Sequence, residues 1–129
     1  MGWQETISYG LSDQQLEEII QFIAAYPQVE EAILFGSRAI GTHKPASDVD
    51  IVIKGDGVNS ALAPRLKFDI EEDTYLPYFF DFVAYGTITR EALKQHIDEK
   101  GISIYRKAQD IVRAKQYWID FQERYNANP

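Results

Sequence analysis

The chain has 129 residues, a formal net charge of −7, 45% hydrophobic residues and 26% charged residues. These values are typical of one soluble globular domain over residues 1–129 and exclude a fibrous or disordered chain. There is no cysteine, which excludes disulfide bonds and thiolate metal sites. The acidic balance makes a nucleic-acid partner unlikely, because binding to a phosphate backbone needs clustered Lys and Arg.

The sequence carries no signal for a membrane. No apolar stretch approaches the length of a membrane span, and the N-terminus lacks the basic flank and apolar core of a signal peptide. We therefore expect a cytoplasmic protein with no membrane partner.

The first half of the chain predicts a helix followed by two strands. Ser12 is a predicted helix N-cap with Gln15 as the second half of a capping box, and the helix is expected over about residues 12–26. The run EAILFGS predicts a buried strand that ends at Phe35, SRAIG predicts one helical turn, and THKPAS predicts a loop. The alternating run DVDIVIK predicts a second strand from Asp48 to Lys54.

The second half predicts two more strands and three helices. A helix is expected within residues 59–73 and starts near Pro64, and the run PYFFDFVAYG predicts a third strand. The next helix is expected to begin at Thr89 and to end at Gly101. The run ISIY predicts a last short strand, and a helix follows over residues 107–125.

This order of elements predicts an α+β domain, layered as in α/β proteins, with a small mixed β-sheet and helices packed mainly on one side. We place the core at about residues 12–105 and a C-terminal helical extension at about residues 107–126. The apolar stripe of this extension either packs on the protein's own core or forms a surface for a partner or a second copy, so a homo-oligomer stays open.

Three aspartates are the candidate metal ligands. Residues i and i+2 of a strand point to the same face, so Asp48 and Asp50 present two carboxylates roughly 7 Å apart. Such carboxylates repel each other, whereas Mg²⁺ takes their oxygens and leaves positions open for phosphate and water. Asp81 interrupts an aromatic, Val-containing strand, where a buried charge would be costly unless it ligates a metal. The alternative for Asp81 is a solvent-facing position on an edge strand.

Four further residues are candidates for nucleotide binding. Gly36 lets the backbone approach a ligand closely, and Ser37 adds a hydroxyl donor at the start of the helical turn. Arg38 is interpreted either as a phosphate partner or as a surface charge. Ser47 either bonds a phosphate or carboxylate or caps the start of its strand. His96 is a lone histidine and is expected to be solvated rather than to act as a ligand.

These residues together resemble the nucleotidyltransferase superfamily that includes DNA polymerase beta. Its signature is Gly-Ser, a spacer and Asp-x-Asp, with a third acidic residue on a later strand. In this chain these are Gly36-Ser37, ten intervening residues, Asp48-Val49-Asp50 and Asp81. The wording GSRAxG…SDxDI is similar to the minimal nucleotidyltransferases of bacteria and archaea, which are commonly encoded beside a HEPN-domain partner and act as antitoxins. The resemblance covers residues 31–105 and implies a polymerase beta-like nucleotidyltransferase fold.

The resemblance also implies a reaction: transfer of AMP from ATP, with two Mg²⁺ ions, to a hydroxyl acceptor. It implies that Asp48 and Asp50 hold both metals, and that Asp81 binds the catalytic metal and helps to deprotonate the acceptor. Gly36 and Ser37 would bind the β- and γ-phosphates. In the antitoxin branch the acceptor is a tyrosine of the HEPN toxin. The alternatives are transfer to a small molecule such as an aminoglycoside, and a non-catalytic antitoxin that only binds its partner.

Overall fold

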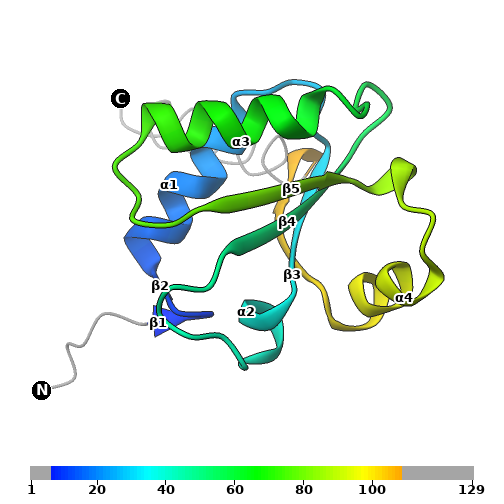
Figure 1. The fold of residues 1–129 in the computed structure, drawn as a ribbon. Coiled ribbons are helices and arrows are strands. Elements are labelled where there is room, and N and C mark those ends of the chain that lie inside the picture. The colour runs from blue at the N-terminus through cyan, green and yellow to red at the C-terminus, as the bar shows by residue number, and fades with distance from the viewer. Residues whose placement is uncertain (1–6, 109–129) are drawn as a thin grey trace, which may run out of the picture.

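The computed structural model describes residues 7–108, which are built around a four-stranded mixed sheet (Figure 1). The strand order is β5-β4-β3-β6. Strand β3 pairs antiparallel with both β4 and β6, and β4 pairs parallel with β5. The strands are β3 (Glu31–Phe35), β4 (Val49–Lys54), β5 (Phe80–Ala84) and β6 (Ile102–Arg106). The predicted mixed sheet is confirmed.

The helices cover both faces of this sheet unequally. Helices α1 and α3 share one face and its main hydrophobic core, whereas α4 packs through Ile97 on the opposite face (Figure 1). A short helix, α2, follows β3 directly, and one turn of 3-10 helix, η1, follows β5. The bounds are α1 (Asp13–Ala24), α2 (Ser37–Ile40), α3 (Leu62–Asp73), η1 (Tyr85–Thr87) and α4 (Glu91–Lys100).

Helix α1 begins where the sequence predicts. The Ser12 hydroxyl accepts a hydrogen bond from the Gln15 backbone N–H at 3.1 Å, and the Gln15 side chain accepts one from the Ser12 N–H at 3.0 Å. This reciprocal capping box satisfies two amide groups that a helix start otherwise leaves without partners. Ile19 and Ile23 are completely buried, so the apolar stripe of the helix packs into the core as expected.

The alternation along β4 determines which way the candidate site faces. Val49, Ile51 and Ile53 are fully buried in the core beneath α1 and α3. Because successive side chains of a strand point to opposite faces, Asp50 and Val52 face the side on which α4 packs. Burial of these three apolar side chains on one face of the sheet therefore holds Asp50 on the other face.

Three details differ from the sequence prediction or extend it. The N-cap of α4 is Arg90 rather than Thr89, so the helix begins one residue later than expected. A hairpin of two-residue strands, β1 (Ile7–Ser8) and β2 (Leu11–Ser12), was not predicted, because two residues are too few for a periodic pattern. The C-terminal helix expected over residues 107–125 lies almost entirely outside the described residues.

Within residues 7–108 no helix is long and apolar enough to cross a membrane.

Candidate active site

The site is centred on two carboxylates that lie side by side on neighbouring strands. In the parallel pairing of β4 with β5, Asp50 is directly opposite Asp81. Neighbouring strands lie roughly 4.8 Å apart, so the two side chains share one face at close range. Asp48 precedes β4 by one residue. The strand that carries Asp81 thus lies directly beside the strand that Asp48 precedes.

The electrostatics at Asp50 indicate a position where negative charge exceeds positive charge. Burial, together with the nearby charges of Asp81 and Asp48, raises the pKa of Asp50 to about 6, although Arg38 opposes the shift. A carboxyl whose pKa is raised in this way is destabilised when it ionises. A bound cation would relieve the repulsion, so the three carboxylates together favour a cation.

The burial argument for Asp81 is wrong, because β5 is an edge strand and the Asp81 side chain is exposed. The alternative prediction, a solvent-facing position on an edge strand, is the one that the structure confirms for Asp81. Its place in the register, opposite Asp50, is what supports a role in the site. Edge position and proximity to Asp50 are compatible, because a side chain on an outermost strand can be exposed and still lie in register with its neighbour.

The carboxylates fit Mg²⁺ that arrives with a phosphate ligand. Within residues 7–108, no three acidic or histidine side chains form a preassembled metal-binding cluster. Mg²⁺ in proteins commonly uses one or two carboxylates and completes its octahedron with substrate phosphates and water. Asp50 and Asp81 supply two adjacent carboxylates and Asp48 a third nearby, which suits that mode of binding.

Gly36 brings the turn after β3 against the Asp50 carboxylate. It caps α2 with φ 76° and ψ −155°, a backbone conformation that side chains strongly disfavour. A Cβ atom built at Gly36 would also collide with the Asp50 carboxylate. Glycine is therefore required here for two reasons, and the turn and the carboxylate form one continuous surface.

Ser37 is the first residue of α2 and is half-buried beside this turn. Within residues 7–108, no protein group bonds its hydroxyl, so the hydroxyl is available to a ligand. Because α2 has only four residues, its dipole is small. The capacity of this turn to hold a phosphate therefore rests on the Ser37 hydroxyl and on close approach of the backbone at Gly36.

Arg38 is not the surface charge that one interpretation predicted, because its side chain is only 1% exposed. Its guanidinium lies over the Tyr78 ring, 4.8 Å from the ring centroid. It donates hydrogen bonds to the carbonyls of Tyr9, Pro45 and Ser47. All four hydrogen bonds of the guanidinium go to backbone oxygens, two of them to the Ser47 carbonyl. We therefore interpret Arg38 as the residue that holds the loop ahead of Asp48 rather than as a phosphate partner.

Ser47 belongs to the same loop. Its carbonyl accepts hydrogen bonds from Arg38 Nε at 3.1 Å and from Nη2 at 2.8 Å. Its hydroxyl accepts one from the Lys44 N–H at 2.8 Å, which closes a local turn. Both groups shape the loop that delivers Asp48, and a contact between Ser47 and nucleotide stays a prediction.

His96 is a site residue that sequence reasoning missed. It lies on α4, and its Nε2 accepts a hydrogen bond from the Gly36 N–H at 3.1 Å. Its ring meets Phe35 edge to face at 6.4 Å. The expectation that His96 is solvated is wrong: the side chain is half-buried. No local pattern could have indicated this contact, because the two partners are 60 residues apart.

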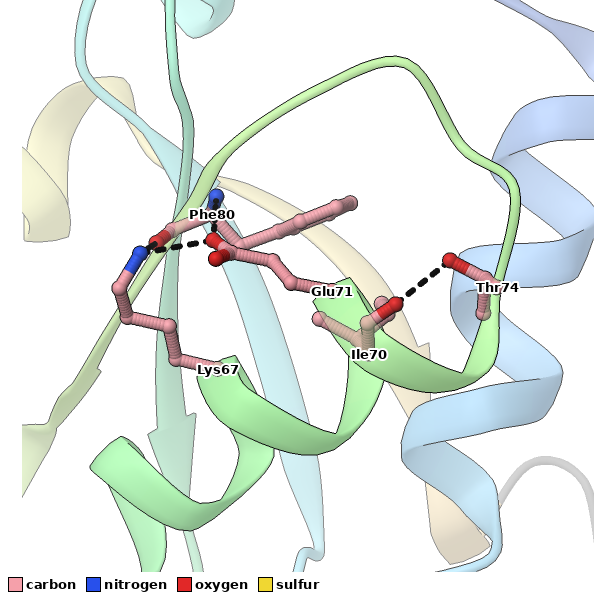
Figure 2. A network of polar contacts seen from close by, with 5 residues as sticks. All are labelled: Lys67, Ile70, Glu71, Thr74 and Phe80. Carbon is pink, nitrogen blue, oxygen red and sulfur yellow. Dashed lines mark hydrogen bonds and ion pairs between the residues drawn. The ribbon is translucent and has the colours of Figure 1, made fainter.

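A second missed feature fixes the start of β5. The Lys67 ammonium bonds the Glu71 carboxylate at 2.7 Å and the Phe80 carbonyl at 2.8 Å, and the Phe80 N–H bonds Glu71 at 2.8 Å (Figure 2). These side chains of α3 satisfy backbone groups on the free edge of the sheet, which would otherwise lack strand partners. We call Lys67 and Glu71 the edge clamp. It holds the residue directly before Asp81.

A hollow of about 1290 Å³ lies at the other end of β4 and is away from these carboxylates. Lys54, Tyr85 and Arg106 are among the residues that line it. It brings together none of the predicted site residues, and the chemistry of the carboxylates points to the opposite end of the sheet.

The family of the chain follows from its sequence. A family profile described as Polymerase beta, Nucleotidyltransferase matches residues 17–110, which include all of the site residues named above. The match spans well over half of the chain, and the chain therefore belongs to this family and carries a nucleotidyltransferase domain. No curated protein sequence matches the chain.

Solved structures share the fold at low sequence identity. A toxin–antitoxin complex with AMP-PNP contains a chain that is 21% identical, with a TM-score of 0.61 and coverage of 87% of this chain and 93% of that one. A tri-AMPylated Shewanella oneidensis HEPN toxin in complex with MNT antitoxin contains one that is 19% identical, with a TM-score of 0.54 and coverage of 87% and 90%. These likenesses confirm the polymerase beta-like nucleotidyltransferase fold.

Proposed function

We propose that this protein is a Mg²⁺-dependent nucleotidyltransferase that transfers AMP from ATP to a tyrosine hydroxyl of a HEPN-type partner protein in the cytoplasm. The observation that carries the proposal is the register of Asp50 opposite Asp81, with the Gly36 turn packed on the Asp50 carboxylate. Family membership supports nucleotidyl transfer.

The residues divide into a phosphate side and a metal side. The Ser37 hydroxyl binds the β- and γ-phosphates of ATP, and the lack of a side chain at Gly36 lets these phosphates approach the turn closely. Asp48, Asp50 and Asp81 would hold two Mg²⁺ ions, which would supply charge neutralisation to the displacement. Burial, and after it the negative charges of Asp81 and Asp48, raise the pKa of Asp50 to about 6. The same negative charges would attract these ions.

The transfer is an in-line displacement at the α-phosphorus. The acceptor oxygen forms a bond to the α-phosphorus while the bond from that phosphorus to the oxygen shared with the β-phosphate breaks. Pyrophosphate leaves with the bonding electron pair, and the Asp81 carboxylate takes the proton of the acceptor hydroxyl. The sheet order suits this geometry, because β4 lies between the Gly36 turn at the end of β3 and Asp81 on β5.

The acceptor then approaches across the free edge of β5. Phe79, directly before β5, is 70% exposed, and its carbonyl accepts a hydrogen bond from the Val49 N–H at 3.0 Å, at the same end of the sheet as the carboxylates. An aromatic side chain of an acceptor gains from ring contact with such a phenyl group. This position favours a tyrosine over a small sugar-like acceptor.

The partner assignment has a separate support. Structures with this fold include a toxin–antitoxin complex with AMP-PNP and an MNT antitoxin bound to a tri-AMPylated HEPN toxin. An acidic surface with a net charge of −7 disfavours a nucleic-acid acceptor. A protein hydroxyl delivered by a HEPN-domain protein encoded nearby therefore remains the acceptor that best fits the chain.

The test follows labelled AMP. The purified protein is incubated with ATP labelled at the α-phosphate, Mg²⁺ and the HEPN-type protein encoded beside its gene, and the partner is then digested and mapped by mass spectrometry. The wild type is expected to label a tyrosine, whereas Asp50→Asn is expected to lose at least a hundredfold in rate, as for other groups that stabilise transition-state charge.

Asp56→Asn is the matched control, because Asp56 is exposed beyond the far end of β4. It should transfer label as the wild type does. If folded wild type binds Mg·ATP and the partner but labels neither protein nor an aminoglycoside, the protein acts by binding alone. Label on an aminoglycoside and not on the partner would instead establish the small-molecule alternative.

A further inference from the structure

The hydrogen bond between His96 and Gly36 joins helix α4 to the turn after β3. Helix α4 packs on the sheet face to which Asp50 and Asp81 point, and its buried residue Ile97 is next to His96. The Gly36 N–H belongs to the turn after β3. Nε2 of His96 is thus the contact through which α4 reaches that turn, at 3.1 Å.

The geometry defines the chemical state of the ring. An N–H donor that faces Nε2 requires that this nitrogen carry no hydrogen, so the ring is neutral with its hydrogen on Nδ1. The edge-to-face contact with Phe35, at an interplanar angle of 72°, restricts rotation of the ring. The acceptor is therefore presented in a fixed direction.

The turn needs such support, because its conformation is intrinsically unfavourable to all residues except glycine. Gly36 has φ 76°, and glycine loses more conformational freedom on ordering than any other residue. The neighbouring Asp50 carboxylate repels Asp81 and Asp48, so the carboxylates do not help to order this region. A bond to the Gly36 N–H opposes rotation at φ directly.

We propose that His96 is the positioning residue of the phosphate-binding turn. By accepting the Gly36 N–H, it holds the turn in the conformation in which the Ser37 hydroxyl and the Asp50 carboxylate face the same Mg·ATP molecule. This inference rests on the proposed function for the identity of the ligand. His96 itself does not touch the reacting atoms, so its effect falls on nucleotide binding and not on the chemical step.

The decisive comparison is between two substitutions at this position. His96→Phe keeps an aromatic ring against Phe35 and removes the acceptor, whereas His96→Gln offers an amide oxygen close to where Nε2 lies. The Kd of a non-hydrolysable Mg·ATP analogue is measured by calorimetry, and circular dichroism confirms that each variant folds. Glu99→Gln, on the exposed side of α4, is the control.

His96→Phe is expected to raise the Kd roughly fivefold to tenfold, the loss that corresponds to one neutral hydrogen bond. His96→Gln should restore the Kd to within about twofold of the wild type. The KM for ATP in AMP transfer should follow the Kd, while kcat stays within about twofold because the reacting groups are unchanged. Exchange of the Gly36 amide hydrogen should be faster in His96→Phe than in the wild type, even without nucleotide.

Two results overturn the inference alone. An unchanged Kd in folded His96→Phe would make the bond merely structural, and a lower Kd would mean that His96 competes with a phosphate for the Gly36 N–H. A wild type that binds Mg·ATP but transfers nothing would overturn the proposed transfer and leave the role of His96 standing. A wild type that binds no Mg·ATP overturns both.

Discussion

At the residue scale, Asp50 is where folding and the proposed chemistry conflict most. Its pKa is raised from 3.8 to about 6 by burial and by the charges of Asp81 and Asp48. A group whose folded pKa exceeds its unfolded pKa contributes stability that is fully present below pH 3.8 and is lost as the pH rises through 6. At neutral pH the ionised Asp50 carboxylate therefore destabilises the metal-free protein, although a cation site requires this negative charge.

We predict that Asp50→Asn stabilises the metal-free protein at pH 7. The gain in free energy of unfolding should be about 1 kcal/mol once solvent screening of this partly exposed group is counted. Urea unfolding at pH 7 and at pH 4 measures it, and the gain should shrink at the lower pH, where the wild-type carboxyl is largely protonated. Asp56→Asn should change neither value, and a destabilised Asp50→Asn would contradict the electrostatic interpretation.

Gly36 yields a second prediction at this scale. Gly36→Ala introduces a Cβ atom at a positive φ and against the Asp50 carboxylate, so it should cost about 1–3 kcal/mol of stability and weaken binding of Mg·ATP at least tenfold. Gly86→Ala is the matched control, because a Cβ atom there meets nothing within 4 Å. Thermal unfolding and calorimetry test the pair. Equal behaviour of the two variants would contradict the role given to the turn.

At the scale of elements, the edge clamp explains how the exposed strand β5 stays in place beside β4. Glu71 and Lys67 lie one helical turn apart on α3, so one face of the helix presents both an acceptor and a donor to the backbone of Phe80 (Figure 2). Burial alone would raise the pKa of Glu71. The pKa is nevertheless lowered below 4.5, because Lys67 and the Phe80 N–H donate hydrogen bonds to the carboxylate and Lys67 is positively charged. The clamp is therefore ionised at neutral pH.

We predict that Glu71→Gln lowers the free energy of unfolding by about 1–2 kcal/mol at pH 7, the value of a hydrogen-bonded charge. A depressed pKa contributes stability above the unfolded pKa and loses it as the pH falls through the folded one. The difference from the wild type should therefore disappear as the pH falls below 4.5. Glu72→Gln, exposed and one residue along, is the control in a pH series of urea titrations.

At the scale of the whole molecule, the sheet order gives the site a direction. The Gly36 turn, the two central aspartates and Asp81 follow one another across β3, β4 and β5 (Figure 1). An in-line displacement needs its leaving group and its acceptor on opposite sides of the phosphorus. Under the proposed function, we therefore expect the nucleotide to lie toward β3 and the partner protein to approach from β5.

We predict that Phe79→Ala lowers the rate of transfer to the partner by roughly tenfold, the contribution of one aromatic contact with the area it buries. The Kd for the Mg·ATP analogue should stay unchanged. Phe68→Ala removes a phenyl group of similar exposure, 64%, from α3 and should leave transfer unaffected. The measurement is the initial rate at which label passes from ATP to the partner. A loss of nucleotide affinity in Phe79→Ala would instead place Phe79 on the side of the site that binds ATP.

The sequence by itself determined the features that depend on neighbouring residues. The Ser12–Gln15 capping box locates the start of α1, and the apolar alternation of β4 turns Asp50 away from the core beneath α1 and α3. The spacing of Gly36-Ser37 from Asp48-Val49-Asp50 indicated the family that the profile match shows. These signals are local because caps and strand periodicity are set within a few residues.

Only the tertiary structure decided how distant parts meet. Parallel pairing places Asp81 opposite Asp50 and on an exposed edge, and packing buries Arg38 against three carbonyls instead of leaving it at the surface. The bond from Gly36 to His96 spans 60 residues. Strand order, register and helix placement depend on contacts between segments far apart in the chain, and the period of a strand or helix specifies which face is apolar but not which partner covers it.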